Sequence, residues 1–558
     1  MLRSILGNVR GDNLRGDLYG GVTAAVVALP LALAFGVASG AGPVAGVYGA
    51  IFVGFFAALF GGTPSQISGP TGPMTVVMAA VLTRYAHEPA LAFTVVMLAG
   101  LFQIGFGALK LGRYINLMPY PVISGFMSGI GCIIIVLQIA PLLGQTNPPG
   151  GPLSAIAAMG EAITHAQSDA LIAGLASLAI VFFLPARIGR LVPAPLVALA
   201  VGTLLVAWVL GAAPVLGTIP EGLPTPQLPT FGLEALPGMI KSALVLAFLG
   251  SLDSLLTSLI ADNITQTHHD SDRELIGQGI GNALAGLMGA IPGAGATMRT
   301  VVNVRAGGRT PTSGLIHALL LLGVMLGLGR YAAYIPHAVL AGILIKVGID
   351  IIDWDYLGRV RRAPLAGVVF MFVVLLLTVL VDLITAVAVG VVMASLLFVK
   401  RMADLQVSGI RTMLEPADDA PLSAEEREVF RRCRGKVLYV NLGGPMSFGA
   451  ANEMGRRLSA QVSYEVLILD LSDVPFIDSS ASLAVEEVIE RARGTRHEVL
   501  LVGIRPAVER VLGKLGVMKL VDIDMRFSNR LAALEQAAAF VEAAEQDGTT
   551  DSAHHGNA

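Results

Sequence analysis

Long apolar runs separated by short polar loops fill the first 400 residues of the chain. Twelve runs approach the roughly 20 apolar residues that a helix needs to cross the hydrocarbon core of a bilayer. They fall at 19–38, 43–62, 90–109, 121–145, 170–185, 192–210, 237–261, 275–291, 312–330, 334–352, 364–384 and 385–399. Two shorter runs, 71–83 and 296–304, each follow a Gly/Pro-rich break. The pattern predicts fourteen membrane segments, of which the third and tenth are too short to span alone.

The two short segments belong to an internal repeat. Leu59–Pro64 resembles Leu287–Pro292, and Met74–Met78 resembles Arg299–Asn303. These matches divide the fourteen segments into two sets of seven. Because seven is odd, the second set enters the membrane in the opposite sense, which gives an inverted repeat. Paired broken helices in such repeats carry the substrate site of many secondary transporters. Two chance Gly/Pro-rich kinks remain the alternative.

Composition supports a polytopic α-helical membrane protein. The chain is 54% hydrophobic and only 14% charged, whereas soluble domains carry about 25% charged residues. A soluble enzyme, a coiled coil and a disordered scaffold are therefore excluded. We find no hydrolase, oxidoreductase or P-loop constellation, and expect neither enzymatic activity nor an organic cofactor. A net charge of −3 gives no reason to expect a nucleic-acid partner.

Charge divides the chain into domains. Residues 1–400 hold 16 of the 40 acidic residues and residues 401–558 hold 24, which predicts a boundary near residue 400. Lys and Arg concentrate in alternate loops, which predicts that both termini are cytoplasmic. We expect a cytoplasmic N-terminus at 1–18, a transmembrane domain at 19–400, a linker at 401–430, a small α/β domain at 431–546 and a disordered tail at 547–558.

The two broken helices are candidates for binding a small anion. A half-helix that starts at mid-membrane points its free N–H groups and positive dipole end at the gap. Thr71 and Thr297 are predicted N-caps, and Gly295 and Ala296 keep the second backbone accessible. Arg299 adds a full positive charge, and an Arg at this depth is costly and usually functional. A structural ion pair is the alternative role for Arg299.

The eighth predicted segment, 237–261, supplies the complementary negative charge. Asp253 and Thr257 lie four residues apart and share one helix face. A carboxylate beside a hydroxyl suits Na⁺ or a transported proton, so both residues are candidate coupling-ion ligands. The alternative is a neutral Asp or a salt bridge to Arg299. Lys346, Asp350 and Asp382 are interpreted as interfacial charges.

Three motifs carry a resemblance to the sulfate permease (SulP) family of anion transporters. They are Leu29–Gly36, Met118–Gly129 and Glu274–Asn282. The resemblance implies a core-and-gate fold of fourteen helices with a cytoplasmic STAS domain, often in a dimer. It also implies a substrate site between segments 3 and 10, with contributions from segments 1 and 8. On this basis Phe35 joins the candidate substrate-binding residues.

Within the family, Gly36–Gly40, Pro70–Thr75 and the Asp253/Thr257 pair resemble the BicA-type sodium-dependent bicarbonate transporters. In that branch the Asp and Thr hold Na⁺, whereas Arg299 stands where a small residue is expected. We therefore expect a secondary transporter of the bacterial-type inner membrane that carries bicarbonate, with Na⁺ as the candidate coupling ion. The alternatives are a sulfate or dicarboxylate symporter with protons, an anion exchanger, an uncoupled channel, and a membrane-anchored regulatory protein.

The region after residue 430 alternates strand and helix patterns, which favours a mainly parallel sheet. Lys436–Leu442, Glu465–Leu471 and Glu498–Gly503 read as buried strands. Val474–Ser480 resembles the motif of STAS domains in which the second Ser is phosphorylated, which makes Ser480 a candidate regulatory site. Asp and Ser are also ordinary helix N-caps, and this simpler role remains open. The STAS domain is a candidate homodimer interface.

Overall fold

The computed structural model describes residues 13–115, 119–147, 151–189, 192–217, 224, 226–232, 234–381, 383–417, 421–447 and 464–554. Most of the expected N-terminal segment, Met118 and Asp382 lie outside these residues. The chain divides into two units, Met1–Ala394 and Ser395–Ala558. This division lies close to the boundary expected near residue 400.

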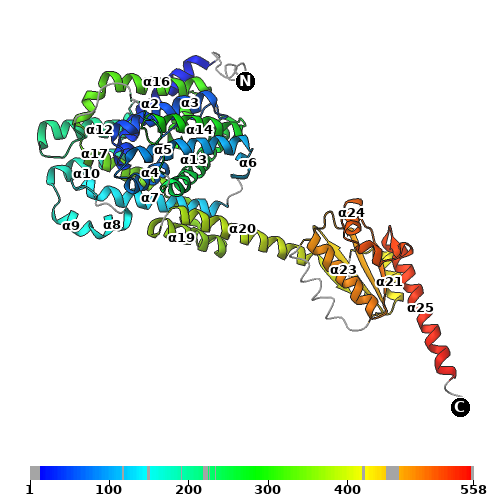
Figure 1. Ribbon diagram of the computed structural model, residues 1–558. Coiled ribbons are helices and arrows are strands. Elements are labelled where there is room, and N and C mark those ends of the chain that lie inside the picture. Colours follow the sequence, from blue (N-terminus) through cyan, green and yellow to red (C-terminus); the bar gives the residue numbers. More distant parts are fainter. Residues whose placement is uncertain are drawn as a thin grey trace. The chain divides into compact units, whose positions relative to one another are not determined.

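Helices build the first unit (Figure 1). They are α2 (Leu14–Ala38), α3 (Pro43–Phe60), α4 (Gly72–Arg84), α5 (Pro89–Ala108), α6 (Gly112–Ile115), α7 (Tyr120–Leu142), α8 (Pro152–Ala157), α9 (Met159–Thr164), α10 (Ser168–Phe183), α11 (Ala186–Gly189), α12 (Ala194–Leu205), η2 (Val206–Leu210), α13 (Leu236–Thr265), α14 (Ser271–Leu287), α15 (Thr297–Arg305), α16 (Pro311–Leu328), η3 (Gly329–Tyr334), α17 (His337–Ile351), α18 (Trp354–Arg359), α19 (Leu365–Leu380) and α20 (Leu383–Ser408). Each of the fourteen predicted ranges coincides with a helix of the described residues. Five of them, α2, α3, α5, α7 and α13, are long and apolar enough to cross a membrane unaided. The number of crossings stays a prediction.

The helices of this unit pack in two groups. In the first group α14 packs against α5 and α3, α16 packs against α2 and α3, and α13 packs against α5. In the second group α7 packs against α17 and α19, and α10 packs against α17 and α12. The short helix α15 contacts α2 and α13 of the first group, and the short helix α4 lies between the groups, in contact with α2 and α13 and with α7. We call the first group the core bundle and the second the gate bundle.

The first helix begins earlier than expected. We place the start of the apolar run at residue 19, but α2 begins at Leu14 and buries Asp17 completely. The Asp17 carboxylate accepts hydrogen bonds from the backbone N–H of Arg309 at 2.8 Å and of Thr310 at 3.0 Å. These are free N–H groups next to the start of α16, and a carboxylate satisfies them well. Asp17 therefore lies inside α2 because its carboxylate caps the N–H groups next to the start of α16.

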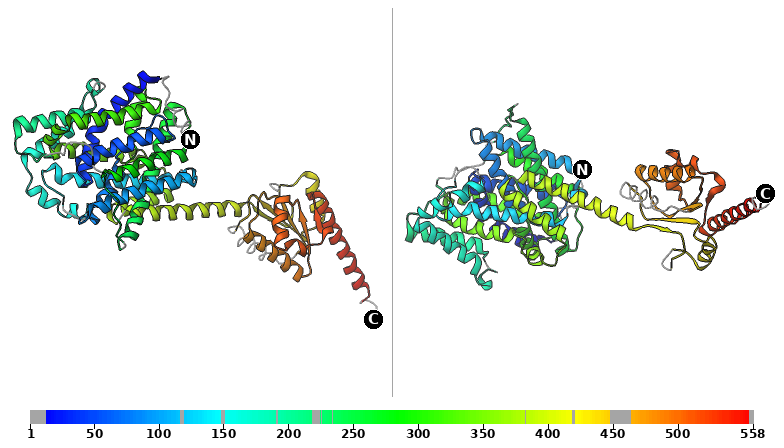
Figure 2. Two further views of the ribbon diagram at one scale, coloured as in Figure 1. Left: turned by 45° about the horizontal axis from the view of Figure 1, so that its top comes forward. Right: turned by 90° about the horizontal axis from the view of Figure 1, so that it is seen from below.

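The second unit is a five-stranded sheet with helices on both faces (Figure 2). The order is β3-β4-β5-β6-β7, formed by β3 (Ile410–Met413), β4 (Val437–Gly443), β5 (Val466–Asp473), β6 (Glu498–Val502) and β7 (Arg526–Phe527). The strands pair in parallel except β3, which runs antiparallel to β4. Helices α23 (Ser479–Gly494) and α24 (Pro506–Lys514) cover one face, and α21 (Ala424–Arg432) and α25 (Arg530–His554) cover the other. The expected mainly parallel sheet is thus present.

Two expected boundaries of the tail differ from the structure. The expected linker 401–430 contains the end of α20, the edge strand β3 and most of α21. A four-residue edge strand carries too little periodicity to be recognised from sequence. The expected disordered tail from residue 547 continues α25 as far as His554, because extending a formed helix is easier than starting one. Residues 555–558 lie outside the described residues.

Candidate functional site

Two strands of two residues each join the predicted half-helices. β1 (Ser68–Gly69) leads into α4, and β2 (Ala294–Gly295) leads into α15. They pair antiparallel, with Ser68 opposite Gly295 and Gly69 opposite Ala294. The N–H of Ala296 also donates to the carbonyl of Ile67 at 2.8 Å. The two breaks that sequence alone leaves far apart therefore meet, as an inverted repeat of paired broken helices requires.

The N-termini of both half-helices border one cavity of about 480 Å³. This volume lies in the range of small-molecule sites. The cavity lies between the bundles, since both contribute to its wall. The core bundle contributes Val27, Leu31, Phe35, Pro70, Thr71, Gly72, Pro73, Asp253, Gly295, Ala296, Thr297, Met298, Arg299 and Val302, and the gate side contributes Met127, Val181, Pro193, Pro195, Ile343, Lys346, Val347, Asp350 and Ile351.

Seven of the eight predicted site residues line this cavity, and Thr257 does not. Thr257 is fully buried behind the wall. Its hydroxyl donates to the carbonyl of Gly295 at 3.0 Å and lies 2.8 Å from the hydroxyl of Thr297. Thr257 therefore joins α13 to the start of α15, within a cluster of oxygen atoms.

The two charged side chains of the core wall are incompletely paired. Asp253 is 7% exposed and Arg299 is 2% exposed. The Oδ2 atom of Asp253 has no hydrogen-bond partner in the structure, nor has Nη1 of Arg299. Nη2 of Arg299 donates to the carbonyl of Pro70. The described residues form no Asp253–Arg299 ion pair, so the salt bridge considered above is absent. Buried charged atoms without partners are costly, so both side chains keep unused hydrogen-bonding capacity in the wall of the cavity.

The threonines at the two half-helices do not cap as expected. Thr71 occupies the N-cap position of α4, but its hydroxyl makes no capping bond and lies instead next to the carboxylate of Asp253. The N-cap of α15 is Ala296, which places Thr297 inside the first turn. The first-turn N–H groups of both helices are thus left without side-chain acceptors. Such N–H groups form a ready site for an anion.

Helix α14 holds both breaks in place with three side chains that lie one turn apart on one face. Its Glu274 accepts from the N–H groups of Gly62 at 2.9 Å and Thr63 at 2.8 Å, and from Gln66 Nε2 at 2.8 Å. One turn later, Gln278 donates to the Ser68 hydroxyl at 2.6 Å. A further turn on, the Asn282 side chain exchanges two hydrogen bonds with Gly293.

The spacing of these three residues is the sequence signal for this role. Glu274, Gln278 and Asn282 recur every four positions, which puts them on one face of a helix. They are buried at 1%, 0% and 0% exposure. From the sequence, the run that contains them stood out only through its family resemblance.

Comparison with known proteins decides the family. The sulfate permease family model matches residues 14–374, and the STAS domain model matches residues 431–532. The chain belongs to the sulfate permease family. Members of this family are membrane transporters rather than enzymes, and the apolar helices agree with a multi-pass membrane protein.

Individual relatives agree with this family. The chain is 47% identical to the bicarbonate transporter BicA of Synechocystis over 86% of each chain. It is 31% identical to the putative sulfate transporter YvdB of Bacillus subtilis, over 82% of this chain and 86% of that one. The solved transmembrane domain of a cyanobacterial BicA matches with a TM-score of 0.66 and 54% identity, covering 68% of this chain and 99% of that domain. The murine solute carrier 26 member A9 shares the fold, with a TM-score of 0.82 at 20% identity over 96% and 94% of the two chains.

In the STAS domain, Asp478 and Ser480 have different roles. Asp478 is the N-cap of α23, and its carboxylate accepts from the N–H of Ala481 at 2.8 Å. Ser480 lies exposed in the first turn of that helix. Capping therefore belongs to the Asp, and the phosphorylation of Ser480 stays a prediction.

Proposed function

We propose that this chain is a secondary transporter that carries bicarbonate across the bacterial inner membrane. The observation that supports it most is the meeting of two uncapped half-helix N-termini with the unpartnered Nη1 of Arg299 at one cavity. Two helix dipoles and a guanidinium favour a small oxyanion. The relatives named bicarbonate transporters, at 46–47% identity, favour bicarbonate over sulfate.

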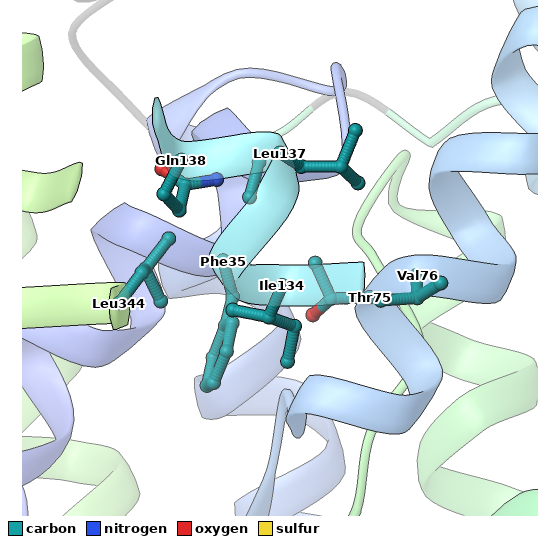
Figure 3. A pocket seen from close by; sticks show the side chains of 8 residues that line it. Phe35, Thr75, Val76, Ile134, Leu137, Gln138 and Leu344 are labelled. Atoms are coloured by element: carbon teal, nitrogen blue, oxygen red, sulfur yellow. The ribbon is translucent and has the colours of Figure 1, made fainter. Parts of the chain in front are cut away.

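Alternating access accounts for the position of the cavity between two bundles. Phe35, Thr75, Ile134 and Leu344 surround a second pocket of only about 10 Å³, in which a single water is at the limit of fitting (Figure 3). From Phe35 the large cavity extends along α2 as far as Val27, in the middle of that helix. In this proposal the narrow second pocket marks the closed side of the site, and the large cavity marks the side that opens.

Na⁺ is the proposed coupling ion, and the oxygen ligands near Asp253 suit this cation. Asp253 has an unpartnered carboxylate oxygen, and the hydroxyls of Thr257 and Thr297 lie together with the carbonyl of Gly295. An all-oxygen set with one carboxylate is what a hard cation prefers. Arg299 brings a fixed positive charge to the same cavity, which favours anion binding even without a cation.

Uptake into proteoliposomes tests the proposal. We expect labelled bicarbonate to enter faster than sulfate or a dicarboxylate, and faster with Na⁺ at fixed pH. Asp253→Asn and Thr257→Val should weaken the Na⁺ dependence, while Ser251→Ala on the same helix should retain it, because Ser251 bonds only within α13. Uptake that follows a pH gradient and ignores Na⁺ would replace Na⁺ by a proton. Uptake that ignores both would leave an exchanger or an uncoupled channel.

We further propose a homodimer with cytoplasmic termini. The dimer follows from the family resemblance, and the STAS domain is its proposed contact. The expected results are a mass of two chains in detergent and labelling of the Arg491→Cys variant by an impermeant thiol reagent only after cell lysis.

A further inference from the structure

The gate wall of the cavity carries a pair of charges whose sequence positions suggested interfacial residues. Lys346 and Asp350 lie one turn apart on α17 and form an ion pair. Both side chains line the large cavity. They are 22% and 42% exposed, so solvent or a ligand in the cavity reaches them.

Structural stability does not explain this pair. An exposed ion pair at i,i+4 contributes little to the free energy of unfolding. The neighbouring cavity-lining residues of α17 are apolar, namely Ile343, Val347 and Ile351. Charged residues within membrane segments are rare and mark ligand pathways by default. The Lys346 ammonium also lies 5.3 Å from the ring centroid of Phe182 on α10, which helps to hold it in the gate bundle.

The charged side chains that line the cavity cancel one another. Asp253 and Arg299 stand on the core wall, and Asp350 and Lys346 on the gate wall. These four side chains sum to zero, and the two half-helix N-termini contribute about half a positive charge each. The cavity thus presents about one positive charge, which suits a monovalent anion. A cation bound at Asp253 would raise the net charge of the cavity. Loss of the Asp350 carboxylate would still add one further positive charge.

We propose that the Lys346–Asp350 pair selects the charge of the transported anion. Lys346 attracts the anion from the gate wall, and Asp350 cancels enough of that charge to disfavour divalent anions. Removing the Asp350 carboxylate would leave about two positive charges, which suits a dianion such as sulfate. The inference rests on the proposed anion transport and adds a specificity-determining pair opposite the half-helices.

Four variants test the pair in proteoliposomes, with the ratio of kcat/KM for sulfate to that for bicarbonate as the readout. Asp350→Asn should raise the ratio about ten-fold, and Lys346→Gln should lower it about ten-fold, by removing the attraction that a dianion needs most. The double variant should return near the wild-type ratio because its net charge is restored. Lys346→Arg should keep the ratio. Lys241→Gln and Asp355→Asn, exposed charges outside the cavity lining, are the matched controls.

Anion-induced thermal stabilisation of the purified variants gives the corresponding ratio of binding affinities without transport. Ratios within two-fold of wild type for both single variants would overturn the inference, even where bicarbonate uptake is intact. Wild-type protein that takes up neither anion contradicts the proposed function instead, and the stabilisation ratio then still decides whether the pair selects by charge.

Discussion

The starts of the two half-helices share a backbone plan and differ in their side chains. The first start, at β1 and α4, is uncharged, and the Thr71 hydroxyl makes no capping bond there. The second start, at β2 and α15, carries Arg299 in its first turn and ties Thr297 to Thr257. Both starts leave first-turn N–H groups without a side-chain cap, and only the second adds a full positive charge.

Gly69 shows that the two half-helix starts are complementary. Its φ of +153° is one that side chains rarely adopt, and a Cβ there would lie 2.8 Å from Arg299 Nη1. The first half thus leaves the space that the Arg of the second half fills. The two halves of the repeat share their backbone arrangement and differ in their side chains, with Gly69 in the first and Arg299 in the second.

The largest expected effect comes from replacing Glu274, the side chain that anchors the first half-helix start. Glu274→Gln replaces a buried carboxylate that accepts hydrogen bonds from Gly62, Thr63, Gln66 and Gln278. The side-chain amide of Gln would point an N–H group at neighbouring N–H groups. We therefore expect the substitution to lower the free energy of unfolding by about 3 kcal/mol. The melting temperature of the purified protein in detergent measures it, with Glu161→Gln on α9 as the exposed control. A melting temperature equal to that of the control would show that α14 does not anchor this start.

The charge of the second half-helix start gives the next effect. Arg299→Ala should weaken bicarbonate binding about ten- to a hundred-fold, since a charge-assisted contact contributes about 1.5–3 kcal/mol. Arg305→Ala, at the exposed end of the same helix, is the control and should bind like the wild type. A titration by calorimetry distinguishes them. If Arg299→Ala bound the anion with unchanged affinity, Arg299 would be structural.

The two threonines separate ligand contact from anchoring. Thr71→Val should leave the melting temperature near wild type, because no capping bond is lost, and should lower anion affinity about five-fold. Thr297→Val should lower the melting temperature by the loss of about 1 kcal/mol, because it breaks the bond to Thr257. Equal melting temperatures for the two variants would contradict the asymmetry between the half-helix starts.

The smallest expected effect concerns the cytoplasmic unit. Deleting residues 409–558 after the end of α20 should leave the order of anion preference unchanged, because every cavity-lining residue lies before residue 352. Expression, rate or dimer content should fall. Competition between bicarbonate and sulfate uptake measures the preference, and a reversed order would bring the STAS domain into substrate selection.

Periodicity and composition predict the helices of this chain well. Long apolar runs, Gly/Pro breaks and the acidic shift after residue 400 are strong local signals, and helices match all fourteen expected ranges. The site residues are also accessible to this reasoning, because Asp253 and Arg299 are charges inside apolar segments. Seven predicted residues meet at one cavity.

Contacts between distant segments are harder to predict. Asp17 reads as part of a polar terminus, yet it caps residues near α16. Lys346 and Asp350 read as interfacial, and only the packing of α17 against α7 and α10 turns them to the cavity. Glu274 depends on loops more than 200 residues away in sequence. Such partners are set by tertiary packing, which no local pattern encodes.

The pairing of β1 with β2 has a consequence for how the sequences of the two halves can differ. The two strands pair along their main chains, and side chains of neighbouring helices also hold them: the Gly295 N–H donates to the Ser254 hydroxyl, and Gln278 donates to the Ser68 hydroxyl. A pairing of two main-chain segments tolerates different neighbouring residues in the two halves. Gly69 in one strand and Arg299 after the other are such a difference, and the two residues fit each other.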